Sequence, residues 1–184
     1  MKNNRKIKKI IVFIILFIIF ASVAPASKSI TRTIVVNKAY RLLYVKEGNE
    51  IRQVIPICIG KGGESETPTG TFTIINIIHN PNWYFEGKTY KPYIEDEKNG
   101  LGICWMGISL SGYGLHGTNE PLSPGRNLSH GCVRMNNSDV EKLSKISFVG
   151  ESVEIKEGEN DIIAKHLEGI HILYNIENIL GESK

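Results

Sequence analysis

Short apolar runs separated by turn residues dominate the middle of the chain. Each run is rich in Val, Ile, Leu and Tyr, and glycine, proline or asparagine separates one run from the next, a pattern typical of β-strands. Glu47-Gly48-Asn49 supplies a hairpin turn between the second and third runs. The pattern predicts strands over 33–36, 41–46, 51–59, 72–78, 103–110 and 152–156.

Two segments show helical spacing instead. Ser138-Asp139-Val140-Glu141 reads as a capping box, and Val140, Leu143 and Ile146 follow on one face, so a helix is expected to begin there and to end before Gly150. Residues 157–184 form a C-terminal extension with an amphipathic helical pattern. Packing on the main domain is its expected role, and contact with a partner or a membrane surface is the alternative.

The N-terminus has the layout of a secretory signal. Five basic residues within positions 2–9 precede an apolar run from Ile10 to Phe20, and Ala24-Pro25-Ala26 resembles a cleavage site. The run is nearly long enough to stay in the membrane as an anchor. Residues 1–26 are therefore expected to be a signal peptide or a signal anchor, with the rest of the chain on the extracytoplasmic side, secreted or anchored.

The charge of the chain is uneven. Its formal net charge is +3, but without the five basic residues of the N-terminal segment 17 basic residues face 19 acidic ones. This balance gives no support to nucleic-acid binding. The run Gly60-Lys61-Gly62-Gly63 lacks the full phosphate-loop frame and no helical pattern follows it, so it is interpreted as a turn.

Two further features stay open at this level. The polar and aromatic segment 80–100 is a candidate lid or wall of a cleft, although aromatic side chains in loops also pack in ordinary ways. Of the three cysteines, Cys58 and Cys104 lie in apolar runs and are expected to be buried free thiols rather than a disulfide.

Candidate chemistry is concentrated between Tyr113 and Asn136. This stretch contains His116, His130 and Cys132, and a thiol beside an imidazole can act as a nucleophile. Gly131 allows a sharp turn before the cysteine, so that backbone N–H groups can stabilise a developing oxyanion.

These residues resemble the signature of the L,D-transpeptidase (YkuD-type) catalytic domain family. The resemblance rests on Ser129-His130-Gly131-Cys132-Val133-Arg134, on His116-Gly117-Thr118 and on Thr67-Pro68-Thr69-Gly70-Thr71-Phe72, together with the stretch Asn80-Pro81-Asn82-Trp83-Tyr84. It covers residues 31–156, the expected catalytic domain.

The resemblance implies a fold and a reaction. The fold is a mainly β sandwich of two mixed sheets with one flanking helix. The implied substrate is the tetrapeptide stem of peptidoglycan, which would be cleaved before its terminal D-Ala through a thioester and then joined to a neighbouring stem as a 3→3 cross-link. Water as the acceptor would make the chain an L,D-carboxypeptidase, and a non-catalytic wall-binding protein is the rival from another class. Carbapenem-type inhibitors are expected to acylate the cysteine, and no cofactor is implied.

The same resemblance suggests roles for individual residues. Cys132 is the candidate nucleophile, with a low thiol pKa expected, and His116 is the candidate general base. The carbonyl of Gly117 is expected to orient His116 in preference to Glu120. The N–H groups of Gly131 and Cys132 are expected to form the oxyanion hole.

The remaining candidates surround these two. His130 is expected to shape the pocket, and Tyr113 and Ser129 are candidate substrate contacts, although Ser129 could instead hold the turn. Arg134 could bind a substrate carboxylate or tie the loop to the sheet. A zinc site built from these histidines and Cys132 is disfavoured because no carboxylate or second cysteine stands at ligand spacing. Three histidines without partners at useful spacing are expected on the surface or in the tail: His79, His166 and His171.

Overall fold

The computed structural model describes residues 31–158, which form a mainly β domain with one helix. The expected N-terminal signal or anchor and most of the C-terminal extension, with His166 and His171, lie outside the described residues. In chain order the elements are β1 (Arg32–Asn37), β2 (Leu42–Glu47), β3 (Glu50–Pro56), β4 (Ile59–Gly60), β5 (Gly70–His79), β6 (Trp83–Phe85), β7 (Lys88–Tyr90), β8 (Cys104–Ile108), β9 (Gly114–His116), β10 (Asn127–Ser129), β11 (Val133–Arg134), α2 (Asn137–Ile146) and β12 (Ser152–Lys156).

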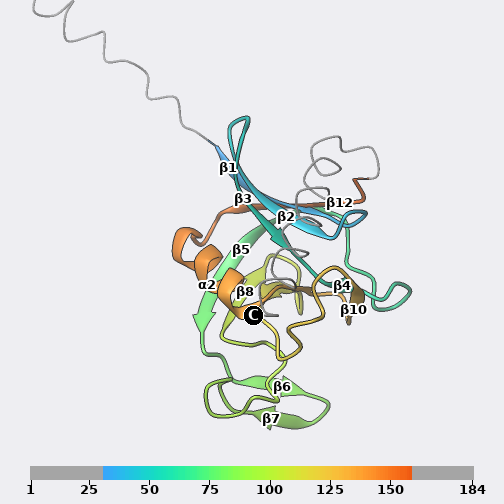
Figure 1. The fold of residues 1–184 in the computed structure, drawn as a ribbon, viewed down its shortest axis with the longest axis vertical. Coiled ribbons are helices and arrows are strands. Elements are labelled where there is room, and N and C mark those ends of the chain that lie inside the picture. Colours follow the sequence, from blue (N-terminus) through green and yellow to red (C-terminus); the bar gives the residue numbers. More distant parts are fainter. Residues whose placement is uncertain (1–30, 159–184) are drawn as a thin grey trace, which may run out of the picture. The chain divides into compact units, whose positions relative to one another are not determined.

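Strand β5 joins the two halves of the main sheet (Figure 1). The eight strands follow the order β11-β9-β8-β5-β12-β1-β2-β3. The first part of β5 pairs with β12, and its second part, from Ile74 onward, pairs with β8, with an irregularity between Ile74 and Asn76. The two halves correspond to the two expected mixed sheets, and they share β5. Each is mixed because it contains one parallel pair, β1–β12 in one half and β9–β11 in the other.

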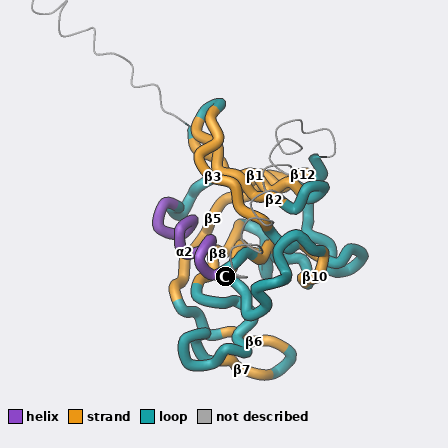
Figure 2. The backbone as a smooth tube through the Cα atoms, viewed as in Figure 1, coloured by secondary structure: helices purple, strands orange, loops and turns teal. Residues whose placement is uncertain are grey.

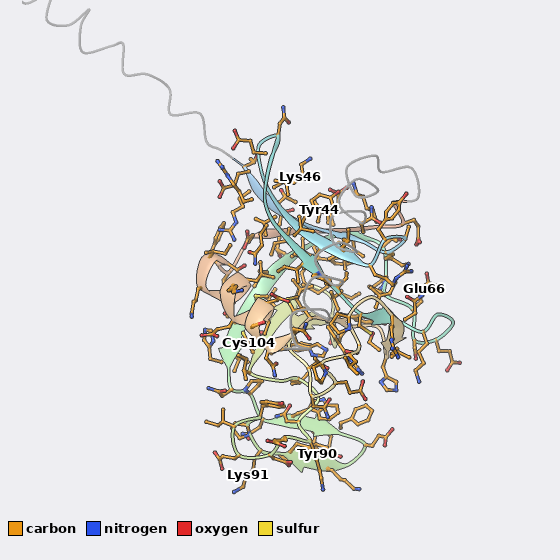
Figure 3. The ribbon with its side chains drawn as sticks, viewed as in Figure 1. Tyr44, Lys46, Glu66, Tyr90, Lys91 and Cys104 are labelled. Atoms are coloured by element: carbon orange, nitrogen blue, oxygen red, sulfur yellow. The ribbon has the colours of Figure 1, made fainter. Side chains whose placement is uncertain are left out.

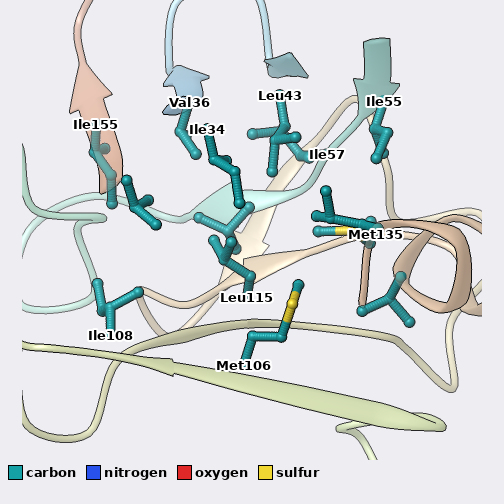
Figure 4. Packing of buried hydrophobic residues seen from close by; sticks show 14 of the residues in the cluster. Ile34, Val36, Leu43, Ile55, Ile57, Met106, Ile108, Leu115, Met135 and Ile155 are labelled. Carbon is teal, nitrogen blue, oxygen red and sulfur yellow. The ribbon is translucent and has the colours of Figure 1, made fainter. Parts of the chain in front are cut away.

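The core lies between these two halves of the sheet. Figure 4 shows Ile34, Val36 and Leu43 facing Met106 and Leu115 from the opposite half. All five side chains are fully buried. Burial of apolar surface contributes about 25 cal/mol per Å² to stability, so this core holds in place the strands β9 and β11, which carry the candidate site.

The expected strands are present, with one break. The run over 51–59 divides because β3 ends at Pro56, and the next two residues bond to other segments. Ile57 donates its N–H to the carbonyl of Arg41, and Cys58 exchanges backbone hydrogen bonds with Arg134. A run of apolar residues cannot reveal this change of partner.

The predicted capping box at Ser138 is wrong. The helix begins at Asn137, its N-cap residue is Asn136, and the N-cap side chain makes no capping hydrogen bond. The amide of Asn137 is instead bonded to Thr118, which lies in the loop after β9. The helix start therefore serves to hold a distant loop.

The segment 80–100 contains a small hairpin that the sequence pattern did not predict. Strands β6 and β7 form it at one end of the domain, beyond long loops (Figure 2). The Trp83 ring stacks on Phe85 with centroids 4.7 Å apart and lies 4.9 Å from Tyr90. Asn99 donates to the carbonyls of Pro81 and Lys91, which closes the segment at its base.

The two cysteines outside the candidate site are confirmed as buried free thiols. Cys58 and Cys104 are both fully buried and unpaired, and Figure 3 shows Cys104 inside the domain beside α2. Between residues 31 and 158 no helix is long and apolar enough to cross a bilayer.

Candidate active site

His116 is the last residue of strand β9. The neighbouring strand β8 sets Trp105 opposite His116, and the two rings stack with centroids 5.8 Å apart. The histidine is 4% exposed. Its Nδ1 lies 2.7 Å from the carbonyl oxygen of Gly117, the partner expected from the sequence. Because a carbonyl only accepts hydrogen bonds, Nδ1 carries the proton and Nε2 keeps its lone pair.

The environment of His116 keeps the ring neutral. Burial and, as a smaller cause, the positive charge of Arg134 together lower its pKa to about 4, against the hydrogen bond to Gly117, which acts in the opposite direction. A neutral imidazole with a free Nε2 at neutral pH is the form required of a general base.

Cys132 precedes strand β11, which runs parallel to β9. The register pairs Val133 with Leu115 and Arg134 with His116. Val133 and Leu115 are both buried in the core, so their chain neighbours turn to the opposite face of the sheet. By the same alternation, Cys132, in the turn just before β11, lies on the face of the sheet that carries His116.

The Cys132 thiol is half-buried, with Sγ 3.5 Å from the carbonyl oxygen of Gly112. Burial raises its pKa, against the smaller lowering effects of the Gly114 backbone and the Arg134 charge. The expectation of a low resting pKa is therefore wrong. The residue types in the sequence could not reveal it, because desolvation depends on the folded surroundings.

Side-chain hydrogen bonds hold the backbone around the cysteine. Ser129 donates to the Cys132 carbonyl oxygen at 2.6 Å and accepts from the Gly131 N–H at 3.1 Å. The Gly131 N–H is thus already used, which corrects its assignment to the oxyanion hole. The Cys132 N–H has no acceptor among residues 31–158 and stays available for that purpose. Ser129 is 1% exposed, so it holds the turn.

The conformation of Gly131 requires glycine. Its φ of 120° is one that residues with a side chain rarely adopt. A Cβ there would lie 2.8 Å from the ring of Tyr113 and 3.2 Å from the Glu66 carbonyl oxygen. Tyr113, expected as a substrate contact, is partly buried against the core and lies beside this turn.

Thr67 supports the backbone beside Cys132, and sequence reasoning assigned no role to it. Its hydroxyl donates to the Gly131 carbonyl oxygen at 2.8 Å and accepts from the Gly60 N–H at 2.9 Å. The side chain is 1% exposed. The first threonine of the Thr67-Pro68-Thr69-Gly70 turn therefore braces the loop Ser129–Cys132, called the cysteine loop below. The motif of this turn was the sequence signal that could have identified Thr67.

Asn137 is the second missed residue, and it acts on the histidine side. Its Oδ1 accepts from the N–H of Thr118 at 3.1 Å and of Ile103 at 3.3 Å, and its Nδ2 donates to the Thr118 carbonyl oxygen at 3.0 Å. A Cβ on Gly117 would lie 2.2 Å from Oδ1. The asparagine therefore fixes the segment whose carbonyl orients His116.

Arg134 pairs with Glu120 across 3.0 Å. The guanidinium is mostly buried and Glu120 is mostly exposed. The pair ties β11 to the loop that follows β9, as the structural interpretation expected, and it leaves Glu120 facing the arginine rather than the histidine.

His130 is exposed and contacts the aromatic hairpin. Its ring lies 5.4 Å from that of Phe85. The contact brings β6 beside the cysteine loop, which favours the wall interpretation of segment 80–100. Across residues 31–158 no three His, Cys, Asp or Glu side chains are close enough together to hold a metal ion.

Residues 31–155 match the YkuD family, described as the L,D-transpeptidase catalytic domain. A Bacillus subtilis protein named as an L,D-transpeptidase, YkuD, is 35% identical over 131 residues, which are 71% of this chain and 70% of that protein. A Bacillus licheniformis relative with the same name is 36% identical over 62% of this chain and 59% of its own length.

Solved structures agree with the fold. A Mycobacterium tuberculosis L,D-transpeptidase superposes with a TM-score of 0.57 at 18% identity, over 69% of this chain and 58% of that chain. Another, described as LdtMt1 in complex with imipenem, gives a TM-score of 0.55 at 17% identity over 68% of this chain and 59% of that chain. The chain thus spans less than two thirds of these proteins. It belongs to the YkuD family of L,D-transpeptidase catalytic domains, which are cysteine-dependent acyltransferases.

Proposed function

We propose that this chain forms 3→3 cross-links between tetrapeptide stems of peptidoglycan, with Cys132 as nucleophile and His116 as general base. The observation that supports this most is the parallel pairing of β9 with β11, by which Cys132 shares a face with an imidazole whose Nε2 is unprotonated. Family membership supports the reaction class.

In the first half-reaction the thiol proton passes to His116 Nε2 as Sγ attacks the carbonyl carbon between the third residue, an L-centre, and the terminal D-Ala. The carbonyl oxygen becomes negative and accepts from the Cys132 N–H. The C–N bond then breaks, His116 returns the proton to the D-Ala nitrogen, and a thioester remains on Cys132.

In the second half-reaction a side-chain amine of a neighbouring stem attacks the thioester carbonyl. His116 takes a proton from this amine and returns it to the departing sulfur, so a peptide bond replaces the thioester. Because both groups are neutral at rest, the thiolate forms only as the proton moves to His116 during attack.

A second candidate differs only in the acceptor. Water in place of the amine would make the chain an L,D-carboxypeptidase, and Cys132 is half-buried rather than sealed from solvent. The experiment is incubation of the purified full chain, in detergent, with a tetrapeptide stem. Release of D-Ala is expected, with cross-linked dimers in the mass spectrum for the transpeptidase or free tripeptide alone for the carboxypeptidase.

Two single substitutions make this experiment decisive. Cys132→Ala is expected to abolish D-Ala release, whereas Cys104→Ala, which removes a buried thiol on β8, is expected to keep most of it. Release by Cys132→Ala would contradict the proposed nucleophile. Stem binding without release by the unmodified chain would favour a non-catalytic wall-binding protein.

Two related proposals concern location and inhibition. The chain works on the extracytoplasmic side and contacts the membrane only through residues 1–26, so its mature mass should show either loss of that segment or its retention as an anchor. Carbapenems acylate Cys132, a proposal that the solved structure of LdtMt1 in complex with imipenem supports. Mass spectrometry should find the adduct on the peptide that contains Cys132.

A further inference from the structure

The half of the sheet that contains β1 and β2 has a second face, which is turned away from the core. Figure 4 shows Ile34, Val36 and Leu43 pointing from these strands into the core. Because side chains alternate along a strand, the neighbouring residues Val35 and Tyr44 lie on the opposite face, called the outer face below. The register agrees with this, since Val35 pairs directly with Tyr44.

The outer face is buried although it is turned away from the core. Val35 and Tyr44 are each 1% exposed. Leu42, two residues before Tyr44 and therefore on the same face, is 0% exposed. A sheet face that meets water carries mainly polar side chains, whereas these three are large and apolar or aromatic. An apolar sheet face of this kind is buried by a second layer packed on top of it.

The described residues supply the border of this face but no layer above it. Tyr40, Ile51 and Val54 pack against Val35 and Tyr44, and they come from the same strands or from the turn between β1 and β2. Side chains of one sheet stand beside one another and leave the top of the face uncovered. Among the elements between residues 31 and 158, α2 packs on β8 and β9, and β1 and β2 are in extensive contact only with each other, β3 and β12.

The chain leaves the described domain at the end of the outer face. Glu157 accepts the N–H of Ala39 at 2.9 Å through its carbonyl, and its carboxylate lies 2.7 Å from the Nζ of Lys38. Asn37, which belongs to the outer face by alternation, is 0% exposed and donates to the carbonyl oxygen of Gly158 at 3.3 Å. Gly158 has a φ of 74°, a left-handed conformation in which the chain turns after β12.

The sequence that follows Gly158 has the pattern of a segment that covers such a face. Ile163, Leu167 and Ile170 recur at intervals of four and three residues, which is the spacing of one side of a helix. Because this segment is tethered beside the outer face, its effective concentration there is in the millimolar range. That tether favours it over a second copy of the chain as the occupant.

We propose that residues 159–184 pack on the outer face through the apolar side chains of this pattern and cover Val35 and Tyr44. The segment then belongs to the domain as its second layer, and its apolar side is not available for a partner or a membrane surface. The candidate site lies on the other half of the sheet, so this packing acts on stability rather than on the chemistry.

The test measures how fast a thiol on the outer face reacts with a labelling reagent in the full chain, in detergent. Val35→Cys places the thiol there, and Ile34→Cys, which points into the core, is the matched control. Both introduced thiols should react slowly, and mass spectrometry of the labelled peptides separates them from Cys132.

Substitutions in the segment should then uncover the outer face alone. Leu167→Asp with Ile170→Asp should raise the labelling rate of Val35→Cys at least about tenfold, because the lost burial of two large apolar side chains is worth more than that factor. The rate of Ile34→Cys should stay low. Asn175→Asp with Asn178→Asp adds the same charge at two polar positions of the segment and should change neither rate.

Four results would overturn the proposal. They are fast labelling of Val35→Cys without the aspartates, an unchanged rate with them, equal acceleration of Ile34→Cys, and protection that grows with protein or detergent concentration. The last would mean that a second copy or a membrane surface covers the face. If circular dichroism shows that the aspartate variant is unfolded, Leu167→Ala with Ile170→Ala replaces it, with the same direction expected for each thiol.

Discussion

The two sides of the candidate site are held in different ways. On the histidine side, His116 lies in a strand, is almost fully buried and has its ring stacked on Trp105. On the cysteine side, Cys132 lies in a turn, is half-buried, and depends on hydroxyl groups bonded to the backbone around it. The histidine side is thus held by strand pairing and by the Asn137 amide, which fixes the loop after β9, whereas the cysteine side is a glycine-containing turn held by two hydroxyl groups.

This difference suits the chemistry. The proposed base, His116, must keep one tautomer, and a buried strand with a backbone acceptor provides that. The proposed nucleophile, Cys132, must be reached by its substrate from solvent, and it is half-buried in a turn that also carries the exposed ring of His130. Substitutions that loosen one side at a time separate these two requirements.

The largest effect on stability and on the rate of D-Ala release is expected from Asn137→Ala, which removes the side chain that supports the histidine side. Three hydrogen bonds to the backbone at Ile103 and Thr118 are lost, at about 1 kcal/mol each, so the free energy of unfolding should fall by about 3 kcal/mol. The rate of D-Ala release should fall with it, because the Gly117 carbonyl is no longer held against His116. Denaturant unfolding and the release assay measure the two effects.

Asn136→Ala is the matched control for that experiment. Its side-chain oxygen is buried without a hydrogen-bond partner among the described residues, and it makes no capping bond. Alanine there should change stability by less than about 1 kcal/mol. Equal losses of unfolding free energy in the two variants would mean that the start of the helix, rather than the amide of Asn137, provides the stability.

A smaller effect is expected from Thr67→Val on the cysteine side. The change keeps the side-chain volume but removes the hydroxyl that bridges Gly60 and Gly131, which should cost about 1–3 kcal/mol of stability. Because the Gly131 backbone then loses its brace, kcat should fall more than KM rises. Thr69→Val, at an exposed position of the same turn, should leave kcat unchanged, and a similar loss there would refute the brace.

These residues also show how far sequence reasoning reached. The strands, the free thiols and the partner of His116 were predicted, because they follow from local patterns and a specific motif. Asn137 was missed because a local capping signal hid bonds to a loop about twenty residues away. The raised pKa of Cys132 and the engaged N–H of Gly131 could not be predicted, since both depend on what the fold brings around them.

The smallest effect on activity is expected from Arg134→Gln. This substitution removes the positive charge that lowers the pKa of both His116 and Cys132. With a neutral His116 as the proposed base, and with burial and Arg134 holding its pKa at about 4, kcat/KM should fall as the pH drops through about 4. Removing the positive charge raises the pKa of His116, so this acidic limb should move upward. It should stay below the ordinary value of 6.5 because burial, the larger cause, remains. The exposed Glu120 loses only a surface ion pair, at about 0–1 kcal/mol. The measurement is a pH profile of kcat/KM for both proteins, with circular dichroism to verify the fold at each pH; an unmoved acidic limb would mean that Arg134 does not act on His116.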